Sequence, residues 1–369
     1  MIPVLIPSLP ETDAIIPYLR RIDQARIYSN YGPLSREFTD RLCRFVSERA
    51  GGAPVAATLT GSGTTAIELA LRYRIAGRGG RLCLMPAYTF AATAHAAVNV
   101  GLEPFFADVD PETLALTPAI AVRALAAAEG DVAAVVVVSP YGAPIDIAAW
   151  EAFEAAHKIP VVFDAAAATL NLHRVAAQPI CVSLHATKAL GIGEGGAILT
   201  TDTDLVAQTT AMTGFGFSVS SRVSEVRGGN YRISEYAAAV GLAVFDGLEA
   251  RIRQLREASL AYVSGFNRIG VRMQPGFGTD WLTMTIAALF EPAAAEVVTA
   301  GFDADRIQWR RWYGTGCHVH PAFATCRHDG LARTAAVAAG AIGVPFFPAI
   351  TPEQIGAVCG CVERSLAAR

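Results

Sequence analysis

The sequence predicts an α/β protein with a large domain, built on a mostly parallel sheet covered by helices, and a smaller C-terminal α/β domain. Short, continuously apolar runs alternate with helix-like stretches through the first half of the chain. Strands that helices bury on both faces have this composition, because neither face meets water. The 369 residues, 52% of them hydrophobic, exceed the ~100–200 residues of a typical domain. We therefore expect a large domain over 1–250 and a small domain over 251–369.

Seven runs are interpreted as strands because they are short and almost wholly apolar. They cover 55–60, 81–86, 103–110, 132–139, 159–166, 180–188 and 195–201. Longer stretches with a helical pattern lie between and after them. These cover 64–76, 90–100, 117–130, 146–158, 232–266, 292–301 and 351–368. The one very long helix, over 232–266, marks the passage from the large domain to the small one.

Composition and charge exclude several classes of protein. The net charge of −3 gives no basic footprint for nucleic acid. The N-terminus lacks the basic start of a signal peptide, and no apolar stretch is long enough to span a bilayer. The seven cysteines are dispersed, and the close pair Cys359 and Cys361 falls on different faces of a helix. We expect a reduced, cytoplasmic enzyme without a nucleic-acid or membrane partner and without a metal.

The segment "GIGEGG" (191–196) matches the G-x-G-x-x-G fingerprint of dinucleotide-binding proteins. A true fingerprint follows a strand and opens a helix, so that the phosphate meets the helix N-terminus. Here "AILTTD" follows and predicts a strand, and Asp202 and Asp204 come too soon to bind a ribose. The glycines are better interpreted as a tight turn beside a bound group, or as a connection between two strands.

Three features fit the chemistry of one cofactor, and the first is "TGSGTTAIELA" (60–70). A strand ends, glycines follow, and Thr64 and Thr65 begin a helix, whose N-terminus is an anion site. An ordinary helix cap is the alternative. The second feature is Asp164, at the end of a buried strand, where α/β sheets bind ligands. It can pair with a cationic ring nitrogen or cap the next helix.

The third feature is Lys188, preceded by Ser183 and His185 and flanked by glycines. A desolvated lysine loses its proton readily and can form a Schiff base; the alternative is a solvated loop lysine. Lys158 and Lys188 are the only lysines, and all other basic charge is arginine. A lysine retained in an apolar stretch indicates that the amine is needed. Together the three features match pyridoxal 5′-phosphate (PLP), with its phosphate, pyridinium nitrogen and aldehyde.

The chain also resembles a known family in several ordered motifs. It is similar to the DegT/StrS-type sugar aminotransferases, a PLP-dependent group with the aspartate-aminotransferase fold, fold type I. The matching stretches are "YSNYGPLSREF" (28–38), "SGTTAIELAL" (62–71), "MPAYTFAATAHAAVNVGLEPFFADVDPETL" (85–114), "SLHATKALGIGEGGAI" (183–198) and "GGNYRISEYAAAVGLAVFDGLEARI" (228–252). The resemblance therefore runs almost from end to end.

The resemblance implies a role for each matching residue. Lys188 would form the Schiff base and carry protons, and Asp164 would hold the pyridine nitrogen. The phosphate would be bound by Gly63, Thr64 and Ser183, and by Asn230 from a neighbouring subunit. Phe90 would stack on the cofactor ring, although ordinary core packing also explains an aromatic residue here. Because family sites lie at a dimer interface, the resemblance implies a homodimer with shared active sites.

Two positions depart from the family pattern. The family usually has Gln or His three residues after the strand-end Asp, where this chain has Ala167, and it often has His where this chain has Ser139. The loss of a hydrogen bond to the ring oxygen would shift the Schiff-base pKa without abolishing transamination. Lys188 itself argues against the related sugar dehydratases, which carry His at that position.

The stretch "RWYGTGCHVHPAF" (311–323) matches the place where family members close the small domain over the substrate. Arg310 and Arg311 are candidates for contact with a nucleotide diphosphate, and His318 and His320 for contact with a sugar or phosphate oxygen. His185 is a further weak candidate for substrate contact. Each also fits an ordinary solvated or packed residue. The "HVH" pattern has no acidic partner nearby, which argues against a metal site.

The resemblance implies a PLP-dependent aminotransferase that moves an amino group, from glutamate, to a keto sugar on a nucleotide diphosphate. The product would serve amino-sugar or surface-polysaccharide biosynthesis. Three alternatives remain: a PLP-dependent sugar dehydratase, an aminotransferase for a cyclitol or another ketone, and a non-catalytic regulatory member. Spacing cannot select the substrate, because pocket shape decides it.

Overall fold

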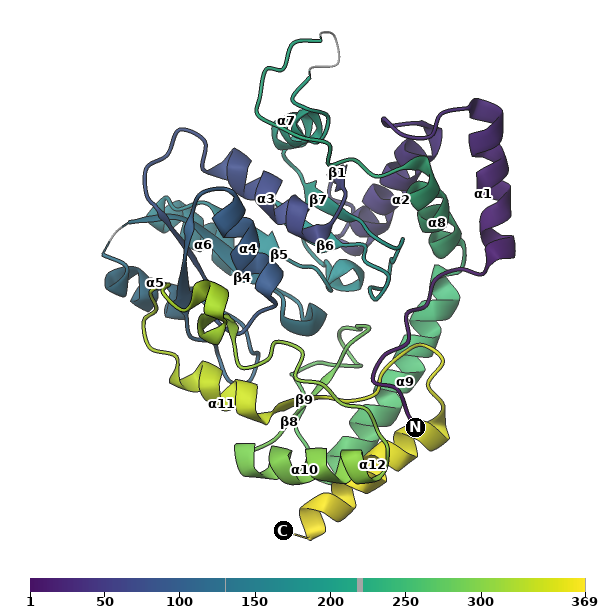
Figure 1. Ribbon diagram of the computed structural model, residues 1–369, viewed down its shortest axis with the longest axis vertical. Coiled ribbons are helices and arrows are strands. Elements are labelled where there is room, and N and C mark those ends of the chain that lie inside the picture. Colours follow the sequence, from purple (N-terminus) through teal and green to yellow (C-terminus); the bar gives the residue numbers. More distant parts are fainter. Residues whose placement is uncertain (130, 218–221, 369) are drawn as a thin grey trace.

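A seven-stranded sheet forms the centre of the computed structural model, which describes residues 1–129, 131–217 and 222–368 (Figure 1). The strands lie in the order β1-β7-β6-β5-β4-β2-β3. Neighbours from β3 to β6 are parallel, and β7 runs antiparallel to both β6 and β1. Their bounds are β1 (Ala56–Thr60), β2 (Leu82–Pro86), β3 (Glu103–Ala107), β4 (Val132–Val138), β5 (Val161–Asp164), β6 (Ile180–Ser183) and β7 (Gly196–Thr200). The predicted α/β class with a mostly parallel sheet is confirmed.

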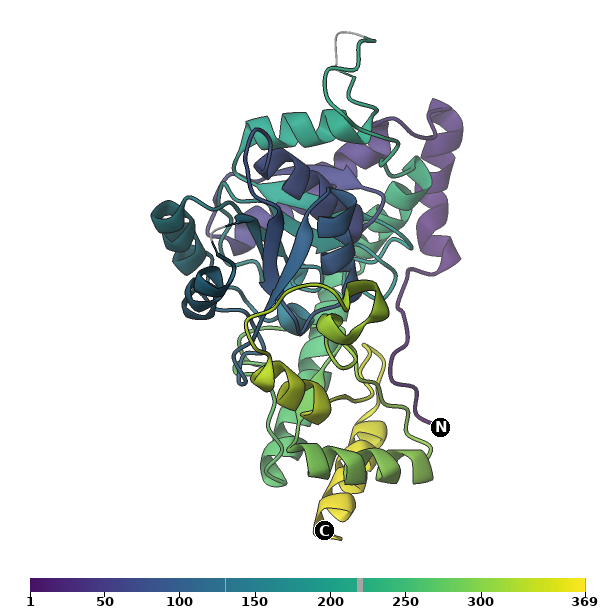
Figure 2. The ribbon, with the colours of Figure 1, turned by 60° about the vertical axis from the view of Figure 1, so that its left-hand side comes forward.

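Helices cover both faces of this sheet, as Figure 2 shows. One face carries α3 (Gly63–Arg74), α4 (Ala91–Asn99) and α7 (Thr203–Thr213), and the other carries α2 (Pro33–Arg49), α5 (Pro118–Ala127) and α6 (Ile147–His157). Successive side chains in β2 alternate between the faces: Leu84 joins one apolar cluster, and Cys83 and Met85 join the other. Since both faces are buried, the strand reads as a continuous apolar run.

Two predicted elements differ most from those observed. The predicted strand 180–188 ends at Ser183, because the chain leaves the sheet there in a turn closed by Leu184 N–H to Gly195 O. The predicted helix 232–266 is in fact two helices, α8 (Glu235–Asp246) and α9 (Leu248–Arg268), separated at Gly247. A periodic apolar pattern that runs across a single glycine hides such a break.

Four α-helices in the described part of the chain were not predicted. They are α1 (Thr12–Ala25), α2, α7 and α11 (Ala332–Gly340). The helix α1 contains Pro17, which argues locally against a helix. It forms because it packs on α8, which in turn packs on α2. Packing contacts between distant segments therefore outweigh the unfavourable effect of Pro17 on the helix.

A smaller unit lies below the sheet unit in Figure 1. It comprises α10 (Pro292–Ala304), α11, α12 (Pro352–Ala367) and the antiparallel pair β8 (Ala287–Leu289) and β9 (Ala341–Gly343), with α9 leading into it. The first residues of the chain join this unit, because Ile2 pairs with Ile307 and Val4 O accepts from Phe346 N. We propose a division near residue 250, with this N-terminal segment on the smaller unit.

Asn171 links the two units from within the core. Its Nδ2 donates to Gly142 O and Leu282 O, at 2.6 and 2.7 Å, and its Oδ1 accepts from Leu282 N at 3.1 Å. All three hydrogen bonds are buried. They involve both Nδ2 and Oδ1 of Asn171 and hold the start of the smaller unit against the sheet unit. No helix in the described part of the chain is long and apolar enough to cross a membrane.

Candidate active site

The site begins at the edge of the sheet where β1 and β6 end and β7 starts. Ser183 of β6 pairs with Gly196 of β7, and Gly196 pairs with Thr60 of β1. A Cβ on Gly196 would lie 2.4 Å from Ser62 O, so only glycine permits this approach. Of the two interpretations of the "GIGEGG" glycines, the connection between two strands is confirmed, because the segment lies between β6 and β7 and β7 starts at Gly196.

The N-terminus of α3 lies directly against Ser183. A Cβ built on Gly63 would be 3.0 Å from Ser183 Cβ, which places these two predicted phosphate ligands in contact. Ser62 caps the helix by accepting from Thr65 N at 3.1 Å. The amides of Gly63 and Thr64 belong to the first turn, where a helix offers no carbonyl acceptor. This arrangement can bind a phosphate through backbone N–H groups.

Asp164 is a buried carboxylate at the end of β5, only 6% exposed. Its Oδ2 accepts from Thr93 Oγ1 at 2.7 Å, and its Oδ1 accepts from Ala166 N at 3.2 Å. Burial raises the pKa of Asp164, and these two donors together with the charge of Lys188 oppose the rise. The alternative role as a helix cap fails, because the next helical turn begins only at Thr169.

Lys188 lies in the turn that follows β6, and its amide donates to His185 O at 2.8 Å. Its side chain is part-buried rather than solvated. Burial lowers the pKa of Lys188, and the nearby Asp164 carboxylate opposes this shift. The amine is therefore held near a buried carboxylate in an environment that favours its neutral, nucleophilic form.

The first turn of α4 brings an aromatic ring and a hydroxyl to the same place. Phe90 is the N-cap residue of α4 and is 63% exposed, so core packing does not explain it. Thr93, three residues later, donates to Asp164 and also bonds Thr89 Oγ1 at 2.9 Å. Sequence reasoning missed Thr93, although its spacing of one helical turn from Phe90 was the available signal.

Other predicted residues lie at the margin. Asn230 is exposed, and its Oδ1 accepts from Arg232 Nη2 at 2.8 Å. The neighbouring Tyr231 O accepts from Gly61 N at 2.6 Å, close in sequence to the start of α3. His185 shares a hydrogen bond of 2.8 Å with Thr187 Oγ1, and its Nε2 lies 3.7 Å from Glu194 Oε1.

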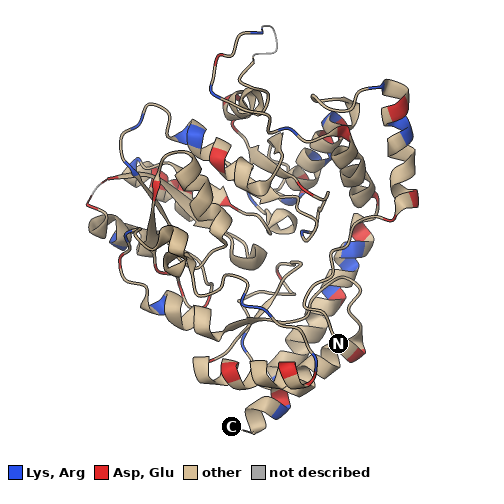
Figure 3. Cartoon of the chain, in the orientation of Figure 1, with Lys and Arg blue, Asp and Glu red and all other residues tan. Residues whose placement is uncertain are grey.

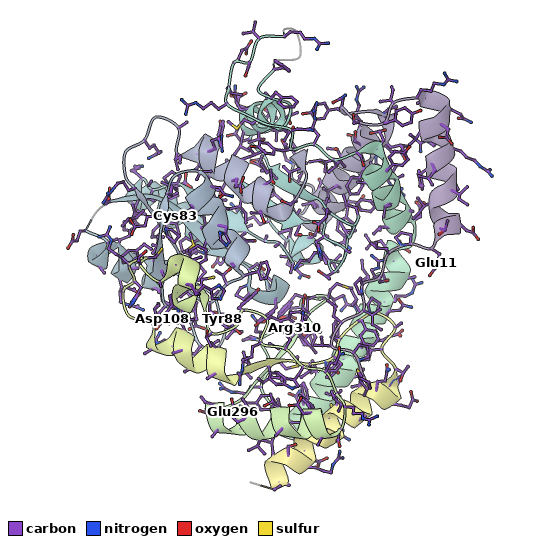
Figure 4. The ribbon with its side chains drawn as sticks, in the orientation of Figure 1. Glu11, Cys83, Tyr88, Asp108, Glu296 and Arg310 are labelled. Carbon is purple, nitrogen blue, oxygen red and sulfur yellow. The ribbon has the colours of Figure 1, made fainter. Side chains whose placement is uncertain are left out.

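The candidates from the smaller unit have partners of their own. Arg311 donates to Ala338 O and Ala339 O at the end of α11, and it forms an ion pair at 2.8 Å with Glu296, which is labelled in Figure 4. These three contacts bind the Arg311 guanidinium within the protein itself. Its neighbour Arg310 is exposed, with its guanidinium over the Trp312 ring.

The two histidines lie on a loop that packs against α4. His318 is part-buried, and burial, followed by the proximity of His328, lowers its pKa. The His320 ring stacks on Phe323 with centroids 6.4 Å apart. Within the described residues, no group of three or more His, Cys, Asp or Glu side chains is arranged to hold a metal ion.

Three tyrosines beside the site, the buried Tyr88 and Tyr141 and the half-buried Tyr313, were missed by sequence reasoning. The hydroxyls of Tyr88 and Tyr141 are 2.7 Å apart, and the Tyr141 ring stacks on Tyr313 at 4.7 Å (Tyr88 is labelled in Figure 4). Tyr313 comes from the smaller unit, so the stack joins the two units. A Cβ at the adjacent Gly142 would lie 2.5 Å from Ala167 O, which leaves no room for a side chain at position 142.

Taken together, these groups fit PLP. The buried Asp164 carboxylate favours a cation beside it, as a protonated ring nitrogen would be. A desolvated lysine suits an aldehyde, the N-terminus of α3 suits a phosphate, and the exposed face of Phe90 suits an aromatic ring. The donors and charges that PLP requires are thus present. Each lies at the end of a strand or helix, or in the turn that follows a strand.

Comparisons with known proteins agree with this geometry. The model of the DegT/DnrJ/EryC1/StrS aminotransferase family matches residues 10–363. Protein Rv3402c of Mycobacterium tuberculosis is 29% identical over 376 residues, covering 99% of this chain and 90% of that protein. The dTDP-4-amino-4,6-dideoxy-D-glucose transaminase of Shigella dysenteriae is 30% identical over 264 residues, 69% of this chain and 68% of that protein. The structure of DesI in the presence of its TDP-sugar product is 30% identical, has a TM-score of 0.84 and covers 99% of this chain and 95% of DesI.

Proposed function

The chain belongs to the DegT/DnrJ/EryC1/StrS aminotransferase family, and on this basis we propose that it transfers an amino group from glutamate to a keto sugar carried by a nucleotide diphosphate. It is a PLP-dependent aminotransferase of fold type I. The sugar substrate is proposed because relatives of similar length, the Shigella transaminase and DesI, are named for such sugars. The product would serve amino-sugar or surface-polysaccharide biosynthesis.

One observation supports the catalytic assignment: Asp164, at the end of β5, and Lys188, in the turn after β6, come from neighbouring strands and lie close enough for each charge to shift the pKa of the other. Lys188 Nζ would hold the cofactor covalently, and Asp164 would keep its ring nitrogen protonated. Gly63, Thr64 and Ser183 would bind the phosphate. When bound, the cofactor supplies the carbonyl carbon that receives the amino group and a ring that delocalises charge.

Lys188 would also act as the general base and acid. Its lowered pKa makes the neutral amine more available, so Nζ would be able to accept a proton from a substrate carbon and to donate it again. Asp164, buried and bonded to Thr93, would stay ionised while a cation lies beside it. Phe90 would stack on the ring and limit its tilt.

We propose that two copies of the chain share their active sites. The described residues that follow α7 project beyond the sheet unit (Figures 1 and 2), and two of them have exposed apolar rings, Phe215 at 45% and Phe217 at 39%. Phe215 also lies under the Arg232 guanidinium, 5.3 Å from its ring centroid. An exposed aromatic and arginine surface is typical of a protein interface. Asn230, on the same segment, would reach the cofactor phosphate of the partner.

Replacing Asn230 by alanine is expected to weaken PLP binding about tenfold, since one hydrogen bond to a charged phosphate contributes roughly 1.5 kcal/mol. Equilibrium titration of the apoprotein with PLP, followed by visible absorbance, measures this. Asn30→Ala is the matched control, because Asn30 is the other asparagine that accepts from Arg232. Equal PLP affinity in Asn230→Ala and native protein would remove the cross-subunit assignment.

The function is tested by the visible spectrum of the PLP-loaded protein before and after glutamate. Conversion of the visible band by glutamate establishes the donor half-reaction. A panel of nucleotide-linked keto sugars, a cyclitol ketone and free keto acids then identifies the acceptor by mass spectrometry of the aminated product. Conversion only by another donor overturns glutamate. Loss of water from a sugar without amination indicates a dehydratase, and a protein that forms no visible band with PLP would be a non-catalytic member.

A further inference from the structure

Arg251 is a buried cation whose contacts are all neutral oxygens. It is only 9% exposed. Its Nη1 donates to Ala189 O at 2.7 Å, and its Nη2 donates to Ser8 O at 2.6 Å and approaches Ser8 Oγ at 3.4 Å. In the part of the chain that the structure describes, no carboxylate is recorded as its partner, and burial lowers the pKa of Arg251. Burying a charge without an opposite charge costs folding free energy. This cost indicates that the contacts of Arg251 with the two carbonyls serve the fold or the site.

The carbonyl that Arg251 binds belongs to the residue directly after Lys188. The turn around Lys188 is closed by Lys188 N–H to His185 O and by Gly191 N–H to Lys188 O, at 2.8 and 3.1 Å. Among the described residues, no backbone N–H is recorded as donating to Ala189 O, and the Arg251 guanidinium is its recorded donor. The peptide next to the lysine therefore depends on a side chain from another element.

That side chain comes from the first turn of α9, the helix that leads from the sheet unit into the smaller unit (Figure 1). The N-terminal half of α9 is rich in arginine, visible as blue segments in Figure 3. Ser8 belongs to the N-terminal segment that runs from the smaller unit towards α1. Arg251 thus ties together the lysine turn, the connecting helix and the N-terminal segment.

We propose that Arg251 is a positioning residue for Lys188: it fixes the peptide of Ala189 and so holds the lysine in the place from which it attacks and carries protons. The inference rests on the proposed role of Lys188. A lysine on an unanchored turn would sample more positions, and a displacement of about 1 Å can cost roughly 100-fold in rate. The rigid guanidinium fork suits two carbonyls at once, which a lysine ammonium holds less precisely.

Arg251→Met keeps an unbranched chain about as long as the aliphatic stem of arginine and removes the guanidinium with both of its donors. We expect kcat to fall about 10- to 100-fold with little change in the KM for the amino donor, and PLP to dissociate from the holoenzyme several-fold faster. Arg251→Lys retains one charged donor and is expected to recover part of both losses. This second variant is the milder change, and it tests the inference if the methionine variant does not fold.

Arg41→Met is the control, because Arg41 also donates to a backbone carbonyl, Leu242 O in α8, and to the Asp246 carboxylate, and neither belongs to the lysine turn. It should change the melting temperature without changing kcat or PLP release. If Arg251→Met or Arg251→Lys folds with native kcat and native PLP release, the inference is overturned and Arg251 is structural only. The proposed function fails by a different result, namely an active Lys188→Ala protein, so the two failures are distinguishable.

Discussion

Lys188→Ala is expected to abolish transamination, with a loss of at least about 10³-fold, while the protein stays folded. The variant removes both the nucleophile and the proton carrier, and general acid–base catalysis alone accounts for roughly 10²–10⁴-fold. Folding should survive because the Lys188 side chain is part-buried and its ammonium is desolvated, so the native state loses little by its removal. Product formation from glutamate and an accepted keto substrate, and a thermal melt of the same sample, measure the two outcomes.

Lys158 provides the control, since it is the other lysine of the chain. It ends α6 with a left-handed backbone, φ 58°, which asparagine tolerates, so Lys158→Asn should be active. Borohydride reduction of the PLP-loaded protein and peptide mapping then show which lysine carries the cofactor. Label on Lys158, or turnover in Lys188→Ala within tenfold of native, would refute the assignment of Lys188.

Asp164→Asn is expected to have the second-largest effect, a fall in kcat of about 10²–10³-fold. An opposite charge a few ångströms away shifts a pKa by 1–3 units, and each unit corresponds to about 1.4 kcal/mol. Asparagine has the shape of the carboxylate and can still accept from Thr93 Oγ1, yet it cannot stabilise a protonated ring nitrogen. Steady-state kinetics with saturating donor and PLP measure the loss.

Thr93→Val separates the effect of the Asp164 charge from the effect of the position of its carboxylate. This variant leaves the Asp164 charge but removes the hydroxyl that donates to Oδ2 at 2.7 Å. We expect a loss of about tenfold, smaller than in Asp164→Asn, because a hydrogen bond to a charged group contributes roughly 1.5–3 kcal/mol and Ala166 N still donates. If the two variants lose equal activity, Asp164 acts by position and the role of its charge is wrong.

Several parts of the site follow from sequence because they depend on local pattern. Asp164 and Ser183 each follow an apolar run, and parallel strands end at one edge, so their proximity to the site was predictable. The scarcity of lysine singled out Lys188. The family resemblance added Asn230 and Phe90. Both are exposed in the single chain, but a contact from Asn230 to the site of a second subunit stays a prediction.

Other parts depend on contacts between segments far apart in sequence. Thr93 lies 71 residues from Asp164, and Arg251 lies 62 residues from Ala189. Arg311 was a candidate for a nucleotide diphosphate, yet its guanidinium is held by the end of α11 and by Glu296. Nothing in the local pattern distinguishes an arginine that binds carbonyls of its own chain from one that binds a ligand.

The sequence by itself determined the α/β class, the mostly parallel sheet and the family. Apolar periodicity and ordered motifs are local, so they are visible in the order of the residues alone. Only the tertiary structure decided that Lys188 lies in a turn, that 232–266 divides at Gly247 and that Asp164 is bonded to Thr93. The physical reason is that desolvation and hydrogen bonding depend on which segments meet in space. The pKa shifts of Lys188 and Asp164 arise mainly from burial, which the folded chain creates, and from the charge that each places near the other.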